Sequence, residues 1–561
     1  MHQSVALVFM MLASAWLLVL RPHDCVAGPS LSAQIRENLR TRIETAGTPL
    51  RISIGQERVH SSSVLPRFYE NRMYQPAWSD DHGPLQQTES LIKAIRAADH
   101  EGLNPSDYHL EEIERILTEV LREAGSRSGL YPPRLADLDL LLTDAFLIYG
   151  SHLLAGSVNP ETFDPEWYAD RREVDLGSVL HTAVESDRIA DALKGLWPAH
   201  SDYLRLREAL TRYRDIVGWG GWPIVATGSK LQKGDRGERV IALRKRLFAS
   251  GDLQGELSNS DELFDDELET AVRVFQYRHG LDVDGVVGRA TLAALNVPAE
   301  IRVRQIELNM ERWRWLPQDL GSPHILVNIA NFKLCVVDDG LPIISMRVVV
   351  GREYRRTPVL SDRMTYLVLS PYWHIPHNVA VQDILPRIRE DSDYLEVQRI
   401  RVFEGWGVEA KEVDPKTVDW SRMDPSTFRY RLRQDPGPWN ALGRVKFMFP
   451  NKFNVYFHDT PSQELFAKTK RSFSSGCIRI ERPIELAEYL LRGDPQWTRE
   501  KLLAAIKTGA EQTVRLPEPI PVHLLYWTAW ADEDGSIHFR DDIYGRDRRL
   551  DLALGEAVPE P

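Results

Sequence analysis

The residues of this chain best suited to covalent chemistry lie between His458 and Cys477. A thiol attacks a carbonyl carbon only as the thiolate, so a cysteine nucleophile needs a nearby imidazole that takes its proton. Gly476 lets the backbone turn sharply beside the cysteine, so that successive N–H groups point at the oxygen of a tetrahedral intermediate. The pattern therefore predicts acyl transfer through Cys477, with His458 as the base.

The other two cysteines of the chain do not compete for this role. Cys25 lies in the N-terminal apolar segment, and Cys335 lies in the apolar run 332–337, where a buried strand cysteine is expected. A chain of 561 residues with three cysteines is not a disulfide scaffold. Only Cys477 stands in a polar turn, and a thiol that is open to oxidation there requires a chemical reason.

Composition and spacing disfavour two other kinds of site. The formal net charge of -12 disfavours a protein whose main partner is nucleic acid, because gripping phosphates requires a basic face. His374 and His377 have a short spacing, but no third ligand accompanies them, so we expect no metal and no other cofactor.

The candidate catalytic residues lie in a β-rich part of the chain that follows Pro323. Asp338, Asp339 and Gly340 between two apolar runs predict a hairpin. The segment 375–442 is longer, more charged and less periodic, which indicates an inserted lid subdomain rather than more sheet. A terminal hairpin is expected within 518–561. The predicted strands are 325–337, 342–350, 364–369, 446–449 and 455–458.

Two helical units precede the β-rich part, since a chain of this length exceeds a single hydrophobic core. In residues 60–225, amphipathic helical runs alternate with Pro and Gly breaks, which predicts a mainly helical domain. The clearest helical runs are 91–98 and 135–154. Range 233–297 places apolar residues at helical spacing before turn signals, which predicts a small three-helix module. The predicted fold class is therefore α+β, with several domains.

The N-terminus has the pattern of an export segment. Residues 5–20 form an apolar run that is short for a membrane span, and the small residues up to Ala27 suit cleavage before Gly28. Residues 1–27 are therefore a cleaved signal peptide or an uncleaved N-terminal anchor. Both alternatives place the rest of the chain outside the cytoplasm, with membrane contact only through this segment.

Three sequence stretches carry a resemblance to a known family. A histidine at a strand end, followed by Ser474-Ser475-Gly476-Cys477-Ile478-Arg479, resembles the catalytic signature of the L,D-transpeptidases. The stretches 449–451 and 309–317 resemble the large Gram-negative members, and 233–297 resembles the common peptidoglycan-binding module. The resemblance implies a periplasmic protein with a helical scaffold domain and a β-rich catalytic domain over 323–517, which carries the lid.

The resemblance also implies roles for single residues. Cys477 is the nucleophile, His458 the base, and the backbone of Gly476 and Cys477 the oxyanion donor. Arg479 organises the turn or pairs with a carboxylate of the substrate. Either the Asp459 side chain or a backbone carbonyl orients the imidazole. The further candidates for substrate binding are Tyr456, Ser475, Trp373 and Asn451.

The reaction implied by the resemblance begins with attack on the carbonyl before the terminal D-alanine of a peptidoglycan tetrapeptide stem. A diaminopimelate amine then resolves the thioester to a 3-3 cross-link, whereas water would give carboxypeptidase trimming. The same residues also suit attachment or release of a wall-linked protein. The non-enzymatic alternative is a peptidoglycan-binding scaffold. Stem peptides are the expected partners, a glycan-polymerising synthase is a candidate partner, and carbapenems are expected to acylate Cys477.

Overall fold

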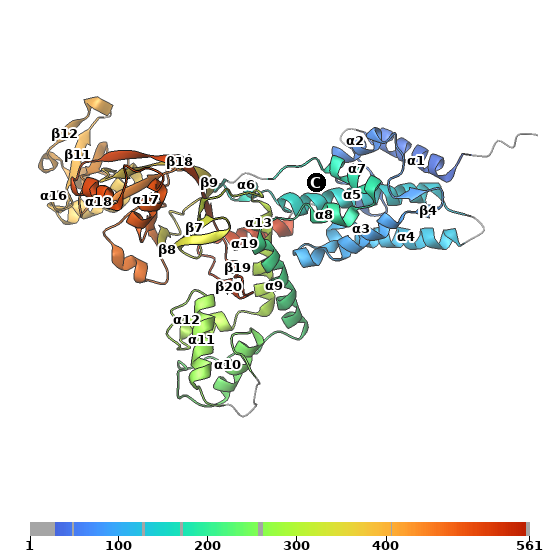
Figure 1. The fold of residues 1–561 in the computed structure, drawn as a ribbon, viewed down its shortest axis with the longest axis horizontal. Coiled ribbons are helices and arrows are strands. Elements are labelled where there is room, and N and C mark those ends of the chain that lie inside the picture. The colour runs from blue at the N-terminus through green and yellow to red at the C-terminus, as the bar shows by residue number, and fades with distance from the viewer. Residues whose placement is uncertain are drawn as a thin grey trace, which may run out of the picture.

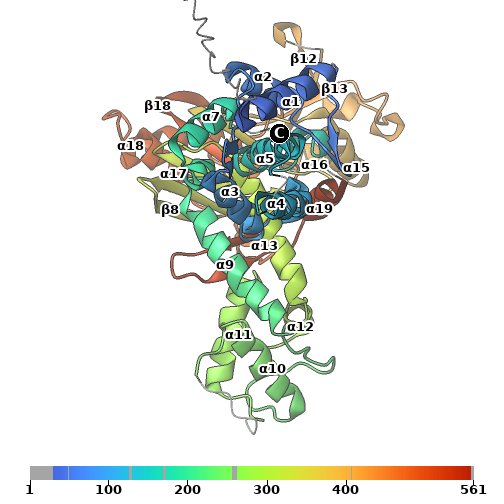
Figure 2. The ribbon, with the colours of Figure 1, turned by 90° about the vertical axis from the view of Figure 1, so that its right-hand side faces the viewer.

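The computed structural model describes residues 29–47, 50–125, 129–168, 172–255, 262–405 and 407–556. The predicted export segment 1–27 lies outside them. Figure 1 shows a helical domain at one end, a β-rich domain at the other, and a small helical module that projects from the region between them. Figure 2 shows the same projection from the side. The predicted α+β multidomain fold is confirmed.

The helical domain is built around α5 (Pro132–Ala155). This helix is long and apolar enough to cross a membrane, but 89% of its most apolar window is buried, so it is a core helix. Ile35 and Leu39 of α1 (Leu31–Thr45) join the same core, which therefore begins before the predicted start at residue 60. The other elements of the domain are α2 (Val64–Asn71), α3 (Gln86–Arg96), α4 (Leu110–Ala124), α6 (Pro160–Phe163), α7 (Leu176–Ser186), α8 (Ile189–Lys194), β1 (Ser53–Ile54), β2 (Glu57–Arg58), β3 (Ser79–Asp80) and β4 (Gly83–Pro84).

Two long helices, α9 (Ser201–Gly218) and α13 (Ala299–Arg314), lie side by side and connect the parts of the molecule (Figure 2). Leu206 and Leu210 of α9 are buried in the core of the β-rich domain, so the predicted range 60–225 crosses from one core into another. The small module between these helices has its own core. Its helices are α10 (Glu238–Ala249), α11 (Asp266–Arg278) and α12 (Arg289–Leu295).

The β-rich domain contains a ten-stranded sheet that closes on itself like a barrel. The order is β14-β15-β17-β8-β7-β6-β18-β9, and β14 also pairs with β9, which closes the ring. The short strand β5 extends the sheet beside β9, and β16 pairs with β8. The bounds are β5 (Trp167–Tyr168), β6 (His324–Asn328), β7 (Lys333–Asp338), β8 (Leu341–Gly351), β9 (Val359–Leu369), β14 (Val445–Met448), β15 (Phe457–His458), β16 (Ser472–Ser474), β17 (Ile478–Ile480) and β18 (Gln512–Leu525), with α17 (Pro483–Leu491) and α18 (Arg499–Lys507) packed beside them.

The chain leaves the predicted strand pattern at two places. The run 325–337 is two strands, because Phe332 adopts a left-handed φ of 54° in the turn between β6 and β7. Strand β18 crosses the predicted boundary at residue 518, so the first residues of the expected C-terminal extension belong to the barrel. The extension then forms the predicted hairpin, β19 (Ala529–Ala531) and β20 (Ile537–Phe539). It ends in a helix, α19 (Arg546–Glu556), that the sequence did not predict.

The predicted lid, 375–442, is a separate subdomain with its own core, which includes Ile375 and Leu432. The expectation that it would add no sheet is wrong, because its strands pair with one another in the order β10-β13-β11-β12, apart from the barrel. Its elements are β10 (Trp373–His374), α14 (His377–Val379), α15 (Leu385–Glu390), α16 (Tyr394–Val397), β11 (Ile400–Glu404), β12 (Lys411–Val413) and β13 (Tyr430–Gln434).

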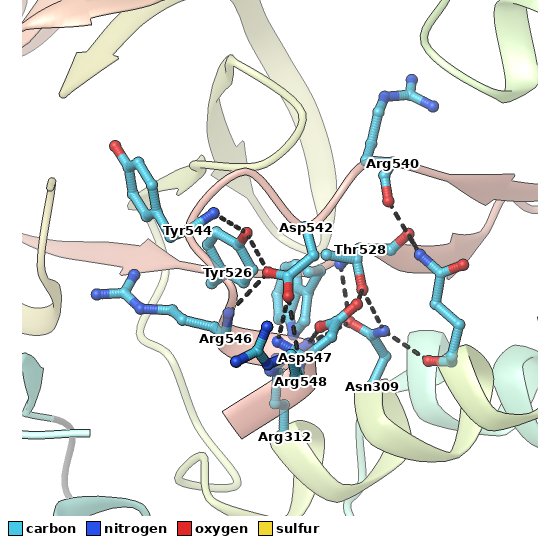
Figure 3. A network of polar contacts seen from close by, with 12 residues as sticks. Asn309, Arg312, Tyr526, Thr528, Arg540, Asp542, Tyr544, Arg546, Asp547 and Arg548 are labelled. Carbon is cyan, nitrogen blue, oxygen red and sulfur yellow. Dashed lines mark hydrogen bonds and ion pairs between the residues drawn. The ribbon is translucent and has the colours of Figure 1, made fainter. Parts of the chain in front are cut away.

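The end of the chain is held against α13 by a buried polar network (Figure 3). The Asn309 amide donates to Thr528 Oγ1 at 2.8 Å, and that hydroxyl donates to Asp547 at 2.7 Å. Arg312 forms an ion pair with the same carboxylate at 2.6 Å. These bonds fix α19 and the segment before it relative to the barrel.

Arg546 extends this attachment to the helical domain. Its guanidinium contacts Asp164 at 2.9 Å and Glu166 at 3.0 Å, two residues that lie between α6 and β5. The same group donates to the backbone carbonyl of Thr357 at 3.3 Å. Arg546 therefore joins the helical domain, the end of the chain and a loop of the barrel at one buried point.

We expect Arg546→Met to destabilise the protein by about 3 kcal/mol, because it leaves the buried Asp164 carboxylate with only the longer ion pair to Arg549. The measurement is the urea midpoint of the full chain, followed by circular dichroism. Arg549→Met is the matched control, because Arg549 is more exposed and lies 3.4 Å from the same carboxylate. Equal midpoints for the two variants would contradict this role.

Candidate active site

The register of three strands places the predicted catalytic residues close together in the barrel. In β15, His458 pairs with Lys446 of β14 on one side and with Arg479 of β17 on the other. Directly paired residues share a face of a sheet, and residues two positions apart along a strand also share it. Tyr456 and Cys477 lie just before these short strands, and the electrostatic contacts of Cys477 with Tyr456, Lys446 and Arg479 place its thiol beside them.

The His458 ring is buried and is held by one nitrogen. Its Nδ1 lies 2.6 Å from the backbone oxygen of Asp459, and a carbonyl oxygen only accepts, so Nδ1 carries the hydrogen and Nε2 is left as the basic nitrogen. Burial lowers the pKa of His458 to about 3, and the positive charges of Arg479 and Lys446 act in the same direction. The imidazole is therefore neutral at physiological pH.

The Asp459 side chain does not touch this ring in any contact of the described residues. Its carboxylate accepts from the backbone N–H and the Nε of Arg444, at 2.9 and 2.8 Å, and from the N–H of Thr460 at 2.8 Å. Gly443 adopts a φ of 61°, and a Cβ there would lie 2.5 Å from the Asp459 side chain. Of the two groups considered for orienting His458, the carbonyl makes the contact, and the carboxylate fixes the start of β14.

Cys477 is half-buried, and its thiol lies 3.8 Å from the backbone oxygen of Asn454. Burial raises the pKa of the Cys477 thiol above its ordinary value, while the backbone N–H and hydroxyl of Tyr456, then Lys446 and Arg479, act in the opposite direction. Within the described residues no hydrogen bond joins this thiol to His458. The resting pair is therefore a thiol and a neutral imidazole, not a thiolate and an imidazolium.

Ser474 holds the turn that carries the cysteine. Its hydroxyl donates to the carbonyl of Cys477 at 2.5 Å and accepts from the N–H of Gly476 at 3.2 Å. The Gly476 N–H, one of the two predicted oxyanion donors, is thus already engaged. The Cys477 N–H has no hydrogen-bond acceptor among the described residues, and we assign it as the free donor of the pair.

The turn is also held from behind by the loop after β8. Thr357 Oγ1 donates to the carbonyl of Gly476 at 2.8 Å and accepts from the N–H of Gly351 at 2.9 Å. The N–H of Thr357 donates to the Tyr544 hydroxyl at 3.2 Å, so the C-terminal segment supports this loop. Gly476 adopts a φ of 113°, and a Cβ there would lie 3.4 Å from the backbone oxygen of Arg356. A side chain at Gly476 would therefore strain the turn through its backbone conformation, since the Cβ itself would make only an ordinary van der Waals contact.

Two of the predicted substrate-binding residues lie beside the cysteine. Arg479 is directly across from His458, and its Nε is buried with no hydrogen-bond partner in the described part of the chain. Ser475 Oγ accepts from Arg355 at 2.8 Å, and Arg355 also forms an ion pair with Asp383 of the lid. Ser475 thus connects the catalytic turn to the lid.

Two further predicted substrate-binding residues, Asn451 and Trp373, have structural contacts. The Asn451 amide donates to the carbonyls of Phe449 and Val455 at 2.7 and 2.8 Å and accepts from the N–H of Val455 at 3.2 Å, so it organises its own loop. Trp373 packs against the hydrophobic core of the lid. These contacts favour a structural role for both residues.

Sequence reasoning missed Lys446, Ser474, Arg355 and Thr357 as members of the site. Lys446 begins the predicted strand 446–449, but which strand would lie beside it is not readable from periodicity. Ser474 was visible at position i–3 from the cysteine, a spacing that suits a side chain closing a tight turn. Arg355 and Thr357 are brought in from 120 and 119 positions away, and no local pattern marks them.

Comparison with known proteins matches three successive parts of this chain. The models are a "Scaffold domain" over 63–210, a "Putative peptidoglycan binding domain" over 236–295 and an "L,D-transpeptidase catalytic domain" over 322–497. The last range contains the whole strand arrangement around His458 and Cys477. Residues 322–497 of this chain form an L,D-transpeptidase catalytic domain.

Individual relatives and one solved structure are similar to parts of this chain. A Haemophilus influenzae protein named "Putative L,D-transpeptidase" is 35% identical over 250 residues, which are 45% of this chain and 49% of the relative, so the chain spans about half the length of that relative. The N-acetylmuramoyl-L-alanine amidase CwlM of Mycobacterium tuberculosis is 44% identical over 75 residues, 12% of this chain and 18% of that protein. A solved L,D-transpeptidase from Xylanimonas cellulosilytica covers 54% of this chain and 99% of its own at 16% identity, but its TM-score of 0.17 carries no argument.

We expect Lys446→Met to slow alkylation of Cys477 in this L,D-transpeptidase domain. The Lys446 ammonium lies 3.9 Å from the centre of the Tyr456 ring and lowers the Cys477 pKa, so its loss raises that pKa and reduces the thiolate fraction at about pH 8. A rise of one pKa unit slows the reaction roughly tenfold. The measurement is the iodoacetamide rate at the Cys477 peptide by mass spectrometry.

The control is Lys452→Met, because Lys452 lies over the rings of Tyr168 and Phe453 and has no part in the Cys477 shift. Its alkylation rate is expected to match that of the unchanged chain. If Lys446→Met left the rate unaltered at every pH from about 6 to 9, the electrostatic role of Lys446 would be wrong.

Proposed function

We propose that this chain is a peptidoglycan L,D-transpeptidase that acts by cysteine acyl transfer from a tetrapeptide stem. The observation that carries the proposal is the buried, neutral His458 ring, which is held through Nδ1 by a carbonyl and whose paired neighbours, Lys446 and Arg479, also act on the Cys477 thiol. Its remaining nitrogen is a base, and the free N–H of Cys477 is an oxyanion donor.

In the proposed first half-reaction, the Cys477 sulfur attacks the carbonyl carbon before the terminal D-alanine while His458 Nε2 takes the thiol proton. The tetrahedral oxyanion is stabilised by the Cys477 N–H. The C–N bond then breaks, His458 returns the proton to the leaving amine, and D-alanine departs from a thioester. An acceptor amine attacks this thioester and gives a proton to His458. The C–S bond then breaks, His458 returns the proton to the sulfur, and a new amide and the free thiol remain.

Arg479 supports a substrate that carries a carboxylate. Its buried Nε lacks a partner in the described structure, and an unpaired guanidinium is costly unless an anion completes it. Because Arg479 lowers the His458 pKa, a bound carboxylate would offset that charge and raise this pKa. In the proposed mechanism the substrate therefore strengthens the base that acts on it.

The acceptor decides between a 3-3 cross-link and hydrolysis, and we propose the diaminopimelate amine of a second stem. The lid supports this choice, because Arg355 ties Asp383 of the lid to Ser475 beside the nucleophile. A lid held at that position excludes water from the thioester while an amine enters along the sheet face. Hydrolysis of the same thioester is the competing outcome.

The proposed partners follow from the same reaction. Stem peptides meet the catalytic domain, the module over 236–295 holds peptidoglycan, and a glycan-polymerising synthase supplies the strands. The enzyme then works outside the cytoplasm, where peptidoglycan lies. Carbapenems carry a strained acyl group and are proposed to acylate Cys477.

The test incubates the full chain with a disaccharide tetrapeptide, followed by intact-mass analysis of protein and products. We expect an adduct on Cys477, loss of one D-alanine, and a dimer joined through two diaminopimelate residues. Cys477→Ala should abolish all three, whereas Cys335→Ala, the matched control on β7, should keep them. The expected loss is more than about 1,000-fold, as for other covalent nucleophiles.

Three results would contradict the proposal in different ways. Cross-linked product from Cys477→Ala would remove the cysteine mechanism. Trimmed monomer without dimer would show a hydrolase. An unreactive Cys477 in a chain that still binds insoluble peptidoglycan would show a scaffold.

A further inference from the structure

A cavity of about 420 Å³ lies where three parts of the chain meet, away from the catalytic turn. Tyr277 enters it from α11 of the small module, Lys333 and Arg347 from strands β7 and β8, and Trp530 from the C-terminal hairpin. Figure 1 shows this hairpin, β19 and β20, between the barrel and the module. The cavity thus exists only because the hairpin holds the module against the barrel.

The contacts around the cavity join the module firmly to the rest of the protein. Arg540 after β20 donates to the backbone oxygen of Arg278 at 2.8 Å, and Arg278 donates to the carbonyl of Ile537. Thr469, eight positions before Cys477, donates to Asp282 of the module. The module therefore contacts both the hairpin and the segment that leads into the catalytic turn.

The cavity shares a sheet face with the active site. His458 pairs with Arg479, Arg479 pairs with Val349, and Arg347 lies two positions from Val349 along β8. Arg347 in turn pairs with Lys333. Because paired residues and alternate residues of a strand point to one side, one continuous face runs from His458 to the cavity.

The cations of the cavity are poorly neutralised. Arg347 is paired with Glu481, but the Lys333 ammonium has no ion pair or hydrogen bond among the described residues. Arg471 donates to backbone carbonyls only, among them those of Phe332 and Val348. The guanidinium of Arg540 likewise meets carbonyl and amide oxygens rather than carboxylates. Asp532 also lines the cavity and acts electrostatically on Lys333 and Arg540, so four cations face the two carboxylates of Glu481 and Asp532. The remaining positive charge is available to an anion.

Aromatic rings border the same cavity. Trp530 stacks on His538 with ring centres 5.0 Å apart, and Arg540 lies 4.7 Å from the Trp530 ring centre. Tyr277 is 61% exposed, and its ring meets His538 edge-on at 5.5 Å. A ring fixed beside a polar cavity offers a flat apolar surface, on which the C–H face of a sugar packs while its hydroxyls reach the polar rim.

We propose that this cavity is a second peptidoglycan subsite, which binds an anionic sugar–peptide with a sugar ring at Tyr277 and a carboxylate at Lys333. The proposal rests on the proposed function, because it needs peptidoglycan as the substrate. A strand held there lies on the face that carries His458. The subsite therefore makes the enzyme prefer stems that are still attached to glycan.

The test measures binding by calorimetry to the full chain with Cys477→Ala, which prevents turnover. The two probes are a tetrasaccharide that carries two tetrapeptide stems and the sugar-free tetrapeptide. Lys333→Glu is expected to weaken binding of the tetrasaccharide roughly tenfold, which is the effect of losing one charge-assisted hydrogen bond. The affinity for the tetrapeptide should not change. Tyr277→Ala is expected to act in the same direction.

The matched controls are Lys501→Glu on α18 and Tyr131→Ala before α5, both exposed and away from the cavity. They should bind both probes like the parent. Equal tetrasaccharide affinity in Lys333→Glu and Lys501→Glu, or no preference of the parent for the tetrasaccharide, would overturn the subsite. Failure of the proposed function gives a different result. The protein with its native Cys477 would then bind the tetrasaccharide but would not be acylated by the tetrapeptide.

Discussion

The short strand β15 lies between β14 and β17, and the chemistry of the site depends on that pairing. It sets Lys446 and Arg479 on either side of His458, so that two cations and burial keep the ring neutral. The same cations favour the Cys477 thiolate against the opposing effect of burial. The two cations thus lower the pKa of both His458 and Cys477, which makes the imidazole a weaker base and favours the thiolate. A carboxylate bound at Arg479 would partly raise the His458 pKa again.

The rest of the molecule supports that pairing from behind. The catalytic turn is closed by Ser474 and held by Thr357, whose loop is fixed by Tyr544 and Arg546 near the end of the chain. Arg546 also meets acidic residues beside the helical domain, so domains far apart in sequence converge on one loop. The C-terminal hairpin then holds the small module against the barrel. The family's chemistry is therefore built on long-range packing around a short motif.

The sequence predicted what local patterns encode and missed what long-range packing decides. The motif around Cys477, the hairpin turn at Gly340 and the helix α5 follow from residue type and periodicity. The partner strands of His458 do not, because a two-residue strand carries no register signal. The neighbouring roles of Asp459 and Asn451 were also unreadable, since each is set by which backbone groups lie near its side chain. The lid's own sheet was missed because its strands are short and charged.

The resting site pairs a neutral His458 imidazole, with its hydrogen on Nδ1, with a Cys477 thiol. Nitrogen-15 NMR of labelled full-length protein reads the tautomer and charge of this ring directly, with His458→Gln identifying the signal. We expect the neutral Nδ1–H form without titration between about pH 5 and 8. An imidazolium signal at about pH 7, or a titration centred near the ordinary value of 6.5, would contradict it.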